Sequence, residues 1–135
     1  MSNIKGAFAK GIFAITLFVE DLDVSIEFYD KTLGLELVYK DDNSGLFKSG
    51  ETYINLLKIT EASELVAPGQ AELSAGIRAV YTLPFSDIDL IASDLQAAGV
   101  KLLNGPIDRP WGVRTISFQD PSGHTWEIAN HTVSN

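Results

Sequence analysis

The sequence predicts an α+β fold made of two βαβββ modules in a pseudo-twofold arrangement, which form a curved β-cup with helices packed outside. The order strand, helix, strand, strand, strand occurs twice along the 135 residues. Matching places in the two halves also carry similar residues, namely Ala14 and Thr16 with Val80 and Thr82, Asp21 and Asp23 with Asp87 and Asp89, and Gly34-Leu35 with Gly99-Val100. A repeat of this size favours one domain over two independent ones, because each half alone leaves a sheet face unburied.

The first module is expected at about residues 12–59. Residues 12–19 have the apolar, β-branched composition of a strand. A helix should follow, with Asp21 or Asp23 as its N-cap and Gly34 just past its end. Its apolar face consists of four residues at helical spacing, Leu22, Ile26, Tyr29 and Leu33. Three more strands complete the module, at residues 35–39, 46–48 and 52–59.

Residues 60–76 show no clear period and contain Pro68-Gly69, so we expect a linker with one helical turn near residues 62–66. The second module then runs from about residue 77 to residue 131. It should hold a strand at 77–85, a helix capped by Ser86 or Asp87 with Ile88, Ile91, Leu95 and Ala98 on one face, and a strand at 100–103. Two further strands at 113–118 and 125–129 are joined by the turn Asp120-Pro121-Ser122-Gly123. Residues 1–11 are expected to form a loose arm, so a single domain spans residues 1–135.

Composition excludes several function classes. The net charge of −8 argues against nucleic acid as a partner, because binding a phosphate backbone needs a basic surface. The chain has no cysteine, which excludes disulfides, thiolate catalysis and cysteine metal sites. The apolar run at residues 12–19 is too short to cross a membrane. We therefore expect a cytoplasmic protein without a membrane partner.

Glu127 is the candidate on which the functional question depends most. It lies between Trp126 and Ile128 in an otherwise apolar strand, where a carboxylate needs a partner, a metal or a wet cavity. One interpretation is that Glu127 accepts hydrogen bonds from a ligand cation or amide. The other is that Arg114 or another internal donor neutralises it. If the chain is catalytic, Glu127 is the expected general base.

Five further residues are candidates for ligand binding. Trp111 and Arg114 could offer an indole platform and a carboxylate-binding guanidinium, or they could close the core edge and form a structural ion pair. Tyr53 and Asn55 share one face of a strand and could form a mixed polar and apolar wall, or a filled interior. Phe47 lies on a short strand beside turns and is a candidate aromatic contact. The other aromatic residues considered are expected in the core, namely Phe13, Phe18, Phe28, Phe118 and Trp126.

The segments VEDLDVSIEFYDKTLGL (residues 19–35) and RPWGVRTISFQDPSGHTWEI (residues 109–128) resemble the vicinal oxygen chelate superfamily. That superfamily includes glyoxalase I, the bleomycin resistance proteins and the extradiol dioxygenases. The resemblance covers residues 12–130, so it implies a single vicinal oxygen chelate domain. Its motifs are specific for the superfamily and not for one activity within it.

The resemblance also implies where a metal would be held. Metal-dependent members place ligands on the first and fourth strands of each module, and these positions fall on Ala14, Asn55, Val80 or one residue either side of it, and Glu127. Of these only Glu127 is a good ligand, whereas a catalytic zinc site takes three protein ligands and a facial iron site needs two histidines. His124 faces the opposite side of the strand from Glu127, and His131 lies farther along it. We therefore expect neither a metal nor another cofactor.

These points lead to a functional hypothesis with two alternatives. We expect a metal-independent small-molecule binding protein of the bleomycin-resistance-like branch, a homodimer whose cup between modules holds an amphipathic or aromatic ligand, cationic ones included. The first alternative is a glyoxalase-like lyase or isomerase, or a dioxygenase, with a non-standard metal site or with Glu127 as base. The second is a protein whose cup is filled by its own side chains and which acts through its dimer surface.

Overall fold

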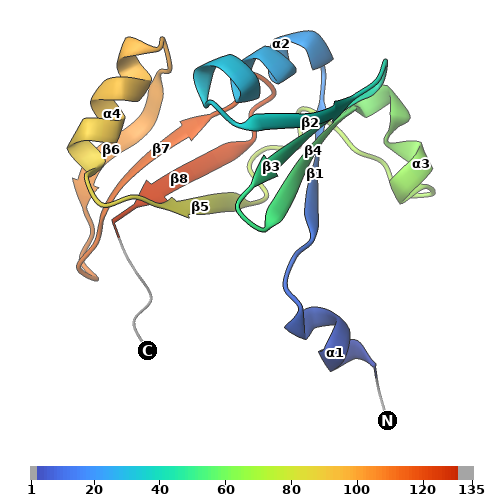
Figure 1. Cartoon of the computed structure of the whole chain (residues 1–135), viewed down its shortest axis with the longest axis horizontal. Coiled ribbons are helices and arrows are strands. Elements are labelled where there is room, and N and C mark those ends of the chain that lie inside the picture. The colour runs from blue at the N-terminus through green and yellow to red at the C-terminus, as the bar shows by residue number, and fades with distance from the viewer. Residues whose placement is uncertain (1–2, 131–135) are drawn as a thin grey trace. The chain divides into compact units, whose positions relative to one another are not determined.

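A computed structural model describes residues 3–130 of the chain. It divides into two compact units, residues 1–73 and residues 74–135. Each unit contains an open four-stranded mixed sheet, and strand, helix and three strands follow one another in both (Figure 1). The predicted α+β class and the twice-used βαβββ order are therefore confirmed.

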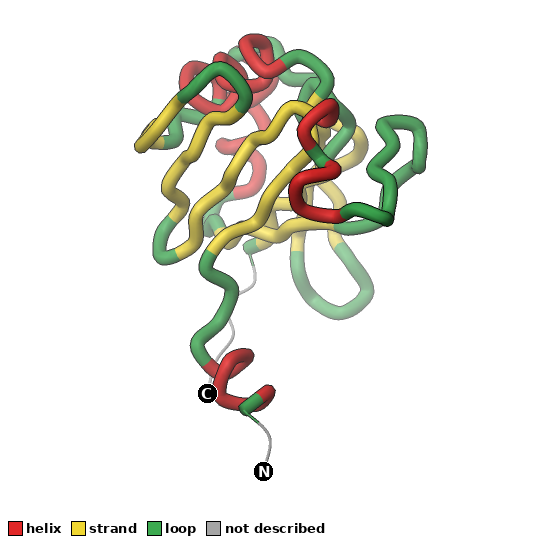
Figure 2. The backbone as a smooth tube through the Cα atoms, turned by 90° about the vertical axis from the view of Figure 1, so that its right-hand side faces the viewer, coloured by secondary structure: helices red, strands yellow, loops and turns green. Residues whose placement is uncertain are grey.

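The first unit begins with a helix that the sequence did not predict. Residues 1–11 were expected to form a loose arm, but α1 spans Ile4–Ala9 and has no buried residue. It stands away from the sheet of its own unit (Figure 2). The remaining elements are β1 (Ala14–Val19), α2 (Leu22–Glu27) with a π-helical turn at Phe28–Thr32, β2 (Glu36–Lys40), β3 (Ser44–Ser49), β4 (Thr52–Lys58), a 3₁₀ turn at Ile59–Glu61 and α3 (Ser63–Val66).

The second unit repeats this order without an N-terminal helix. Its elements are β5 (Val80–Pro84), α4 (Ile88–Ala97), β6 (Leu102–Asp108), β7 (Arg114–Gln119) and β8 (Thr125–Ala129). The strand order is β5-β8-β7-β6, which matches β1-β4-β3-β2 in the first unit. In both sheets the first strand is parallel to the last, and the other neighbours are antiparallel. No helix within residues 3–130 is long and apolar enough to span a membrane.

The two main helices begin with the same cap. Asp21 Oδ1 accepts a hydrogen bond of 3.1 Å from the backbone N–H of Val24, and Asp87 Oδ1 accepts one of 3.1 Å from that of Leu90. Each carboxylate satisfies a donor that has no partner within the helix. Asp21 and Asp87 are thus the N-caps, and Asp23 and Ser86 are not.

Each unit buries one face of its sheet under its helix. In the first unit Tyr29 is fully buried, and its ring centroid lies 5.9 Å from that of Phe47 on β3. In the second unit α4 buries Ile88, Ala92 and Leu95. The predicted helix face included Ala98, which is exposed because the helix ends before it. Phe13, which was expected in the core, is 75% exposed and contacts Tyr53 instead.

Strand β6 has seven residues instead of the four predicted. A glycine within it allows its backbone to pass close to β7. Gly105 has φ of 93°, and a Cβ there would lie 2.5 Å from the carbonyl oxygen of Thr115 on β7. Only glycine accepts both this backbone angle and this close approach. The register between β6 and β7 shifts on both sides of Asn104, and β6 continues beyond these shifts. The sequence did not predict this continuation.

Candidate functional site: the helix-free faces of the two sheets

The two faces of the second sheet can be told apart through Arg114. Its side chain reaches Asp89 of α4, so residues in phase with Arg114 face the helix. On β7 these are Ile116 and Phe118, which are paired in register with Ile128 and Trp126 of β8. The residues between them point the other way. We call that side the helix-free face of the second sheet, and it carries Thr82, Thr115, Ser117, Thr125 and Glu127.

Glu127 lies in the middle of this face, between two hydroxyl residues. Its neighbours in register are Thr82 on β5 and Ser117 on β7. The Thr82 hydroxyl donates a hydrogen bond of 2.9 Å to Glu127 Oε1. The Glu127 side chain is partly exposed, and no salt bridge joins it to a residue within the described range 3–130. A carboxylate held by a neutral hydroxyl keeps its charge and further acceptor capacity available.

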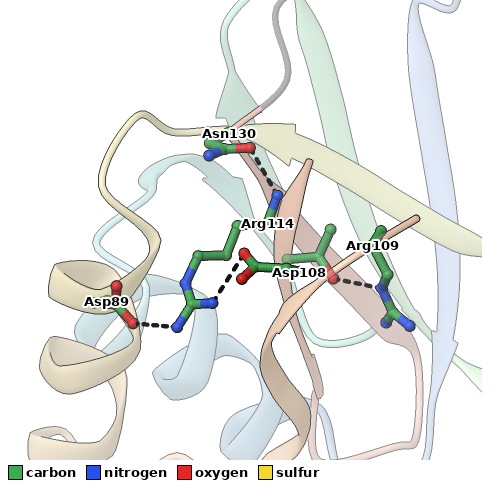
Figure 3. A network of polar contacts seen from close by, with 6 residues as sticks. Asp89, Asp108, Arg109, Arg114 and Asn130 are labelled. Atoms are coloured by element: carbon green, nitrogen blue, oxygen red, sulfur yellow. Dashed lines mark hydrogen bonds and ion pairs between the residues drawn. The ribbon is translucent and has the colours of Figure 1, made fainter. Parts of the chain in front are cut away.

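Arg114 does not neutralise Glu127, contrary to one of the two interpretations above. Its Nη2 contacts Asp89 Oδ1 at 2.9 Å and its Nη1 contacts Asp108 Oδ1 at 3.0 Å (Figure 3). These hydrogen bonds, first that to Asp89 and then that to Asp108, raise the pKa of Arg114 above its ordinary value. Because strand residues alternate, Arg114 and Glu127 occupy opposite faces of one sheet. One ligand lying on one face of this sheet would therefore not meet both side chains, and the contacts of Arg114 are those of the structural ion pair that the second interpretation expected.

Arg109, which the sequence reasoning missed, lies on the same face as Glu127. Its Nε donates a hydrogen bond of 3.0 Å to Thr115 Oγ1, and its Nη2 donates one of 3.4 Å to Asn104 Oδ1. Figure 3 shows the Arg109 guanidinium apart from the Arg114 network. The sequence shows only that Arg109 directly follows Asp108, and the contact of Asp108 with Arg114, which assigns the two arginines to opposite faces, is seen only in the structure.

The first sheet has an equivalent pair on its helix-free face. Thr16 on β1 and Asn55 on β4 are neighbours in register, as Thr82 and Glu127 are in the second sheet. Asn55 Nδ2 donates a long hydrogen bond of 3.5 Å to Thr16 Oγ1. Tyr53 shares this face, and its ring centroid lies 5.2 Å from that of Phe13. This surface of the first unit thus combines an amide with two aromatic rings.

Two aromatic candidates lie elsewhere than expected. Phe47 pairs with Ile54 on the helix side of the first sheet, has no exposed surface and packs against Tyr29, so its assignment to a ligand site is wrong. The alternation of β3 assigns Phe47 to the core regardless of the turns beside it. Trp111 is 71% exposed in the turn between β6 and β7, so it does not close the core edge. It remains available for stacking.

The residues at the four metal-ligand positions do not fit a catalytic metal. Ala14 and Val80 are aliphatic, and their neighbours in register are Tyr53 and Thr125. Between residues 3 and 130 no group of three histidine, cysteine, aspartate or glutamate side chains could hold a metal ion. His124 lies in the turn before β8, where its backbone N–H donates to Asp120 Oδ1. His131 lies outside the described residues.

Residues 11–128 match the family model of the Glyoxalase/Bleomycin resistance protein/Dioxygenase superfamily. The chain belongs to this superfamily. Membership agrees with the open two-sheet α+β fold and with the repeated order of its elements. Membership of the superfamily explains why the two sheets have the same strand order, but it does not explain which residues each helix-free face carries.

Three proteins are similar to this chain over most of its length. The uncharacterized protein YraH of Bacillus subtilis is 35% identical over 119 residues, which cover 84% of this chain and 93% of YraH. The glutathione transferase FosA of Serratia marcescens is 26% identical, over 84% of this chain and 76% of FosA. A crystal structure of a glyoxalase/bleomycin resistance protein/dioxygenase from Nocardioides superposes with a TM-score of 0.79 at 26% identity, covering 95% of this chain and 92% of that one.

Proposed function

We propose that this chain is a metal-independent small-molecule binding protein of the glyoxalase and bleomycin resistance type. Its ligand would be an amphipathic or aromatic small molecule, and the ligand class includes cations. A protein that sequesters an antibiotic would bind such a molecule. The helix-free face of the second sheet would bind the polar part through Glu127, and the exposed Trp111 would supply aromatic surface. The helix-free face of the first sheet offers a second candidate surface at Tyr53 and Asn55.

The contrast between Glu127 and the aliphatic ligand positions carries this proposal. The resemblance assigns Ala14 and Val80 to positions where metal-dependent relatives hold ligands, and neither side chain can donate electrons to a metal. Glu127 nevertheless lies on the helix-free face, where it is partly exposed and, among the residues that the structure describes, its carboxylate is bonded only to a neutral hydroxyl. A carboxylate in that setting can accept hydrogen bonds from an ammonium group or an amide. The net charge of −8 favours the approach of a cation.

A thermal-shift screen with cationic aromatic antibiotics tests the proposal. Ligands that bind the folded chain raise its melting temperature. At least one compound should do so, and the shift should fall in Glu127→Gln and persist in the control Asp94→Asn, which removes an exposed carboxylate of α4. If no compound shifts the melting temperature, the antibiotic-sequestering function is wrong.

An enzymatic function is the alternative, because one relative is named a glutathione transferase. In that case Glu127 would act as a general base in a lyase, isomerase or dioxygenase reaction, with a non-standard metal site or none. Elemental analysis of the purified protein separates the two functions. About one equivalent of zinc, nickel, manganese or iron per chain, with activity lost on chelation, would overturn metal-independent binding.

The homodimer expected from the superfamily and the cytoplasmic location remain predictions. Light scattering coupled to size-exclusion chromatography would test the first of them. A mass equal to the 14.7 kDa of one chain at micromolar concentration would contradict it. Cell fractionation would test the second.

A further inference from the structure

Within the described residues 3–130, Arg109 is a cation without a carboxylate partner. No salt bridge joins it to any residue in the range 3–130, although its side chain is only partly exposed. Its two hydrogen bonds go to the neutral acceptors Thr115 and Asn104. A guanidinium has five N–H donors, so these contacts leave donors and the full positive charge for another molecule. Arg114, five residues later, is held by two carboxylates instead.

The neighbours of Arg109 hold its guanidinium in place. Thr115, which accepts from Nε, lies on the central strand β7 and is 1% exposed. The backbone N–H of Arg109 donates to the Val113 carbonyl at 2.7 Å, which closes the turn between β6 and β7. The adjacent carboxylate, Asp108, is engaged with Arg114 on the opposite face. A guanidinium fixed in this way is suited to bind an oxyanion with two parallel hydrogen bonds.

Arg109 and Glu127 lie on one face of the second sheet, and no ion pair joins them. Thr115 is two residues from Ser117, and Ser117 is the partner of Glu127 in register. Thr115 and Glu127 are therefore diagonal neighbours, a relationship that separates backbone positions by about 7–8 Å. The helix-free face of the second sheet thus carries a cation and an anion, and within residues 3–130 the side chain of each is hydrogen-bonded only to neutral groups.

We propose that Arg109 and Glu127 together bind a zwitterionic small molecule. Its ammonium group contacts the Glu127 carboxylate, and its carboxylate contacts the Arg109 guanidinium. Each charge of the ligand then meets one of opposite sign, and neither end of the site needs a metal. This inference rests on the proposed function and specifies the ligand class. The proposed function requires a cationic group that binds Glu127, and this inference adds that the ligand also carries a carboxylate that binds Arg109.

Three probes of nearly equal shape test the inference on the intact chain. 4-(Aminomethyl)benzoate carries both charges at opposite ends of a ring, 4-methylbenzylamine carries only the cation, and 4-methylbenzoate carries only the anion. Dissociation constants would be measured by NMR titration at pH 7 and low salt. The zwitterion should bind roughly tenfold more tightly than either singly charged probe, since each charged hydrogen bond adds affinity.

Variants assign the two ends of the probe. Arg109→Gln should reduce the affinity for the zwitterion roughly tenfold and leave the affinity for 4-methylbenzylamine unchanged. Glu127→Gln should reduce the affinity for 4-methylbenzylamine and leave the affinity for 4-methylbenzoate unchanged. Arg78→Gln removes an exposed arginine of the same unit and should change nothing. If 4-methylbenzylamine binds the unaltered chain as tightly as the zwitterion does, the oxyanion site is wrong and the proposed function stands. If none of the three probes binds but an antibiotic of the thermal-shift screen does, the zwitterion site is wrong and the proposed function stands; if neither the probes nor the antibiotics bind, both are overturned.

Discussion

The Thr82 hydroxyl donates a hydrogen bond of 2.9 Å to Glu127 Oε1, across the parallel pairing of β5 and β8. Thr16 and Asn55 occupy the equivalent places in β1 and β4. In each sheet a hydroxyl of the first strand thus lies beside the polar residue of the last. The polar residue is an amide in the first sheet and a carboxylate in the second. The free charge of Glu127 makes the second sheet the better candidate for binding.

Replacing Thr82 by valine should weaken binding at Glu127. Valine has nearly the same shape but no hydroxyl, so the carboxylate loses the bond that orients it. A neutral hydrogen bond contributes about 0.5–1.5 kcal/mol, so affinity for 4-methylbenzylamine should fall roughly two- to tenfold. NMR titration measures the change. Thr16→Val, its counterpart in the first sheet, should not alter the affinity, and an equal loss in both variants would contradict the assignment.

Phe47→Ala should destabilise the chain strongly. The ring is fully buried against Tyr29 and leaves a cavity when it is removed, at a cost of about 3–5 kcal/mol. Urea unfolding followed by circular dichroism measures the loss. Trp111→Ala is the matched control, because a 71% exposed side chain contributes little to stability, with a change of about 0.5 kcal/mol or less. Similar losses in the two variants would return Phe47 to the candidates for ligand binding.

Arg114→Gln should lower the melting temperature in a salt-dependent way. The substitution leaves Asp89 and Asp108 without their shared cation. Screening weakens such interactions as the Debye length falls to about 3 Å at 1 M salt. The difference from the unaltered chain should therefore be largest at low ionic strength and shrink in 1 M sodium chloride. A difference that salt does not change would mean that Arg114 acts through packing.

Asp41 should make stability depend on pH. Its Oδ1 accepts from the backbone N–H of Asn43 at 2.9 Å and from the Ser44 N–H and hydroxyl at 2.8 and 3.0 Å. The bond from Asn43 contributes most to lowering the pKa of Asp41 below 3.8. A lowered folded pKa means that the charged form stabilises the fold above pH 3.8 and that this contribution disappears as the pH falls through the folded value.

The variant Asp41→Asn tests this sign. Its deficit in unfolding free energy, measured by urea unfolding, should be present at pH 7 and shrink progressively in acid. Asp42→Asn, in the same turn, removes a charge and leaves the hydrogen bonds of Asp41 intact. A deficit for Asp41→Asn that grows as the pH falls would show that the sign is wrong.

Gly105→Ala should destabilise the chain more than Gly112→Ala. Both glycines have positive φ, 93° and 96°, so alanine is strained at either position. Only at Gly105 does a Cβ also meet backbone, 2.5 Å from the Thr115 oxygen. Alanine at Gly112 should cost about 1–2 kcal/mol, and overpacking at Gly105 should add about 1–3 kcal/mol. Equal costs in urea unfolding would contradict this close approach of β6 to β7.

From β1 onward, the sequence alone determined the order of the strands and of the two main helices and most of their boundaries, because these depend on neighbours in the chain; it did not predict α1. Asp21 and Asp87 cap helices through backbone groups three residues away, and Gly34 follows a helix end with φ of 75°. The pattern of apolar residues likewise identified the strands, and the repeat together with the segments at residues 19–35 and 109–128 identified the superfamily. One strand boundary was predicted wrongly: β6 continues past residue 103 through two register shifts, and this continuation depends on its pairing with β7.

The candidate site depended on the tertiary structure instead. Arg109 and Arg114 flank one turn and have the same chemistry, yet one has two carboxylate partners and the other only neutral ones. Which partners each meets depends on the register of β6 with β7 and on the position of α4. Phe47 is buried for a similar reason, because α2 covers its side of the sheet. Alternation along a strand is local, but which face a helix covers is decided only when the elements pack.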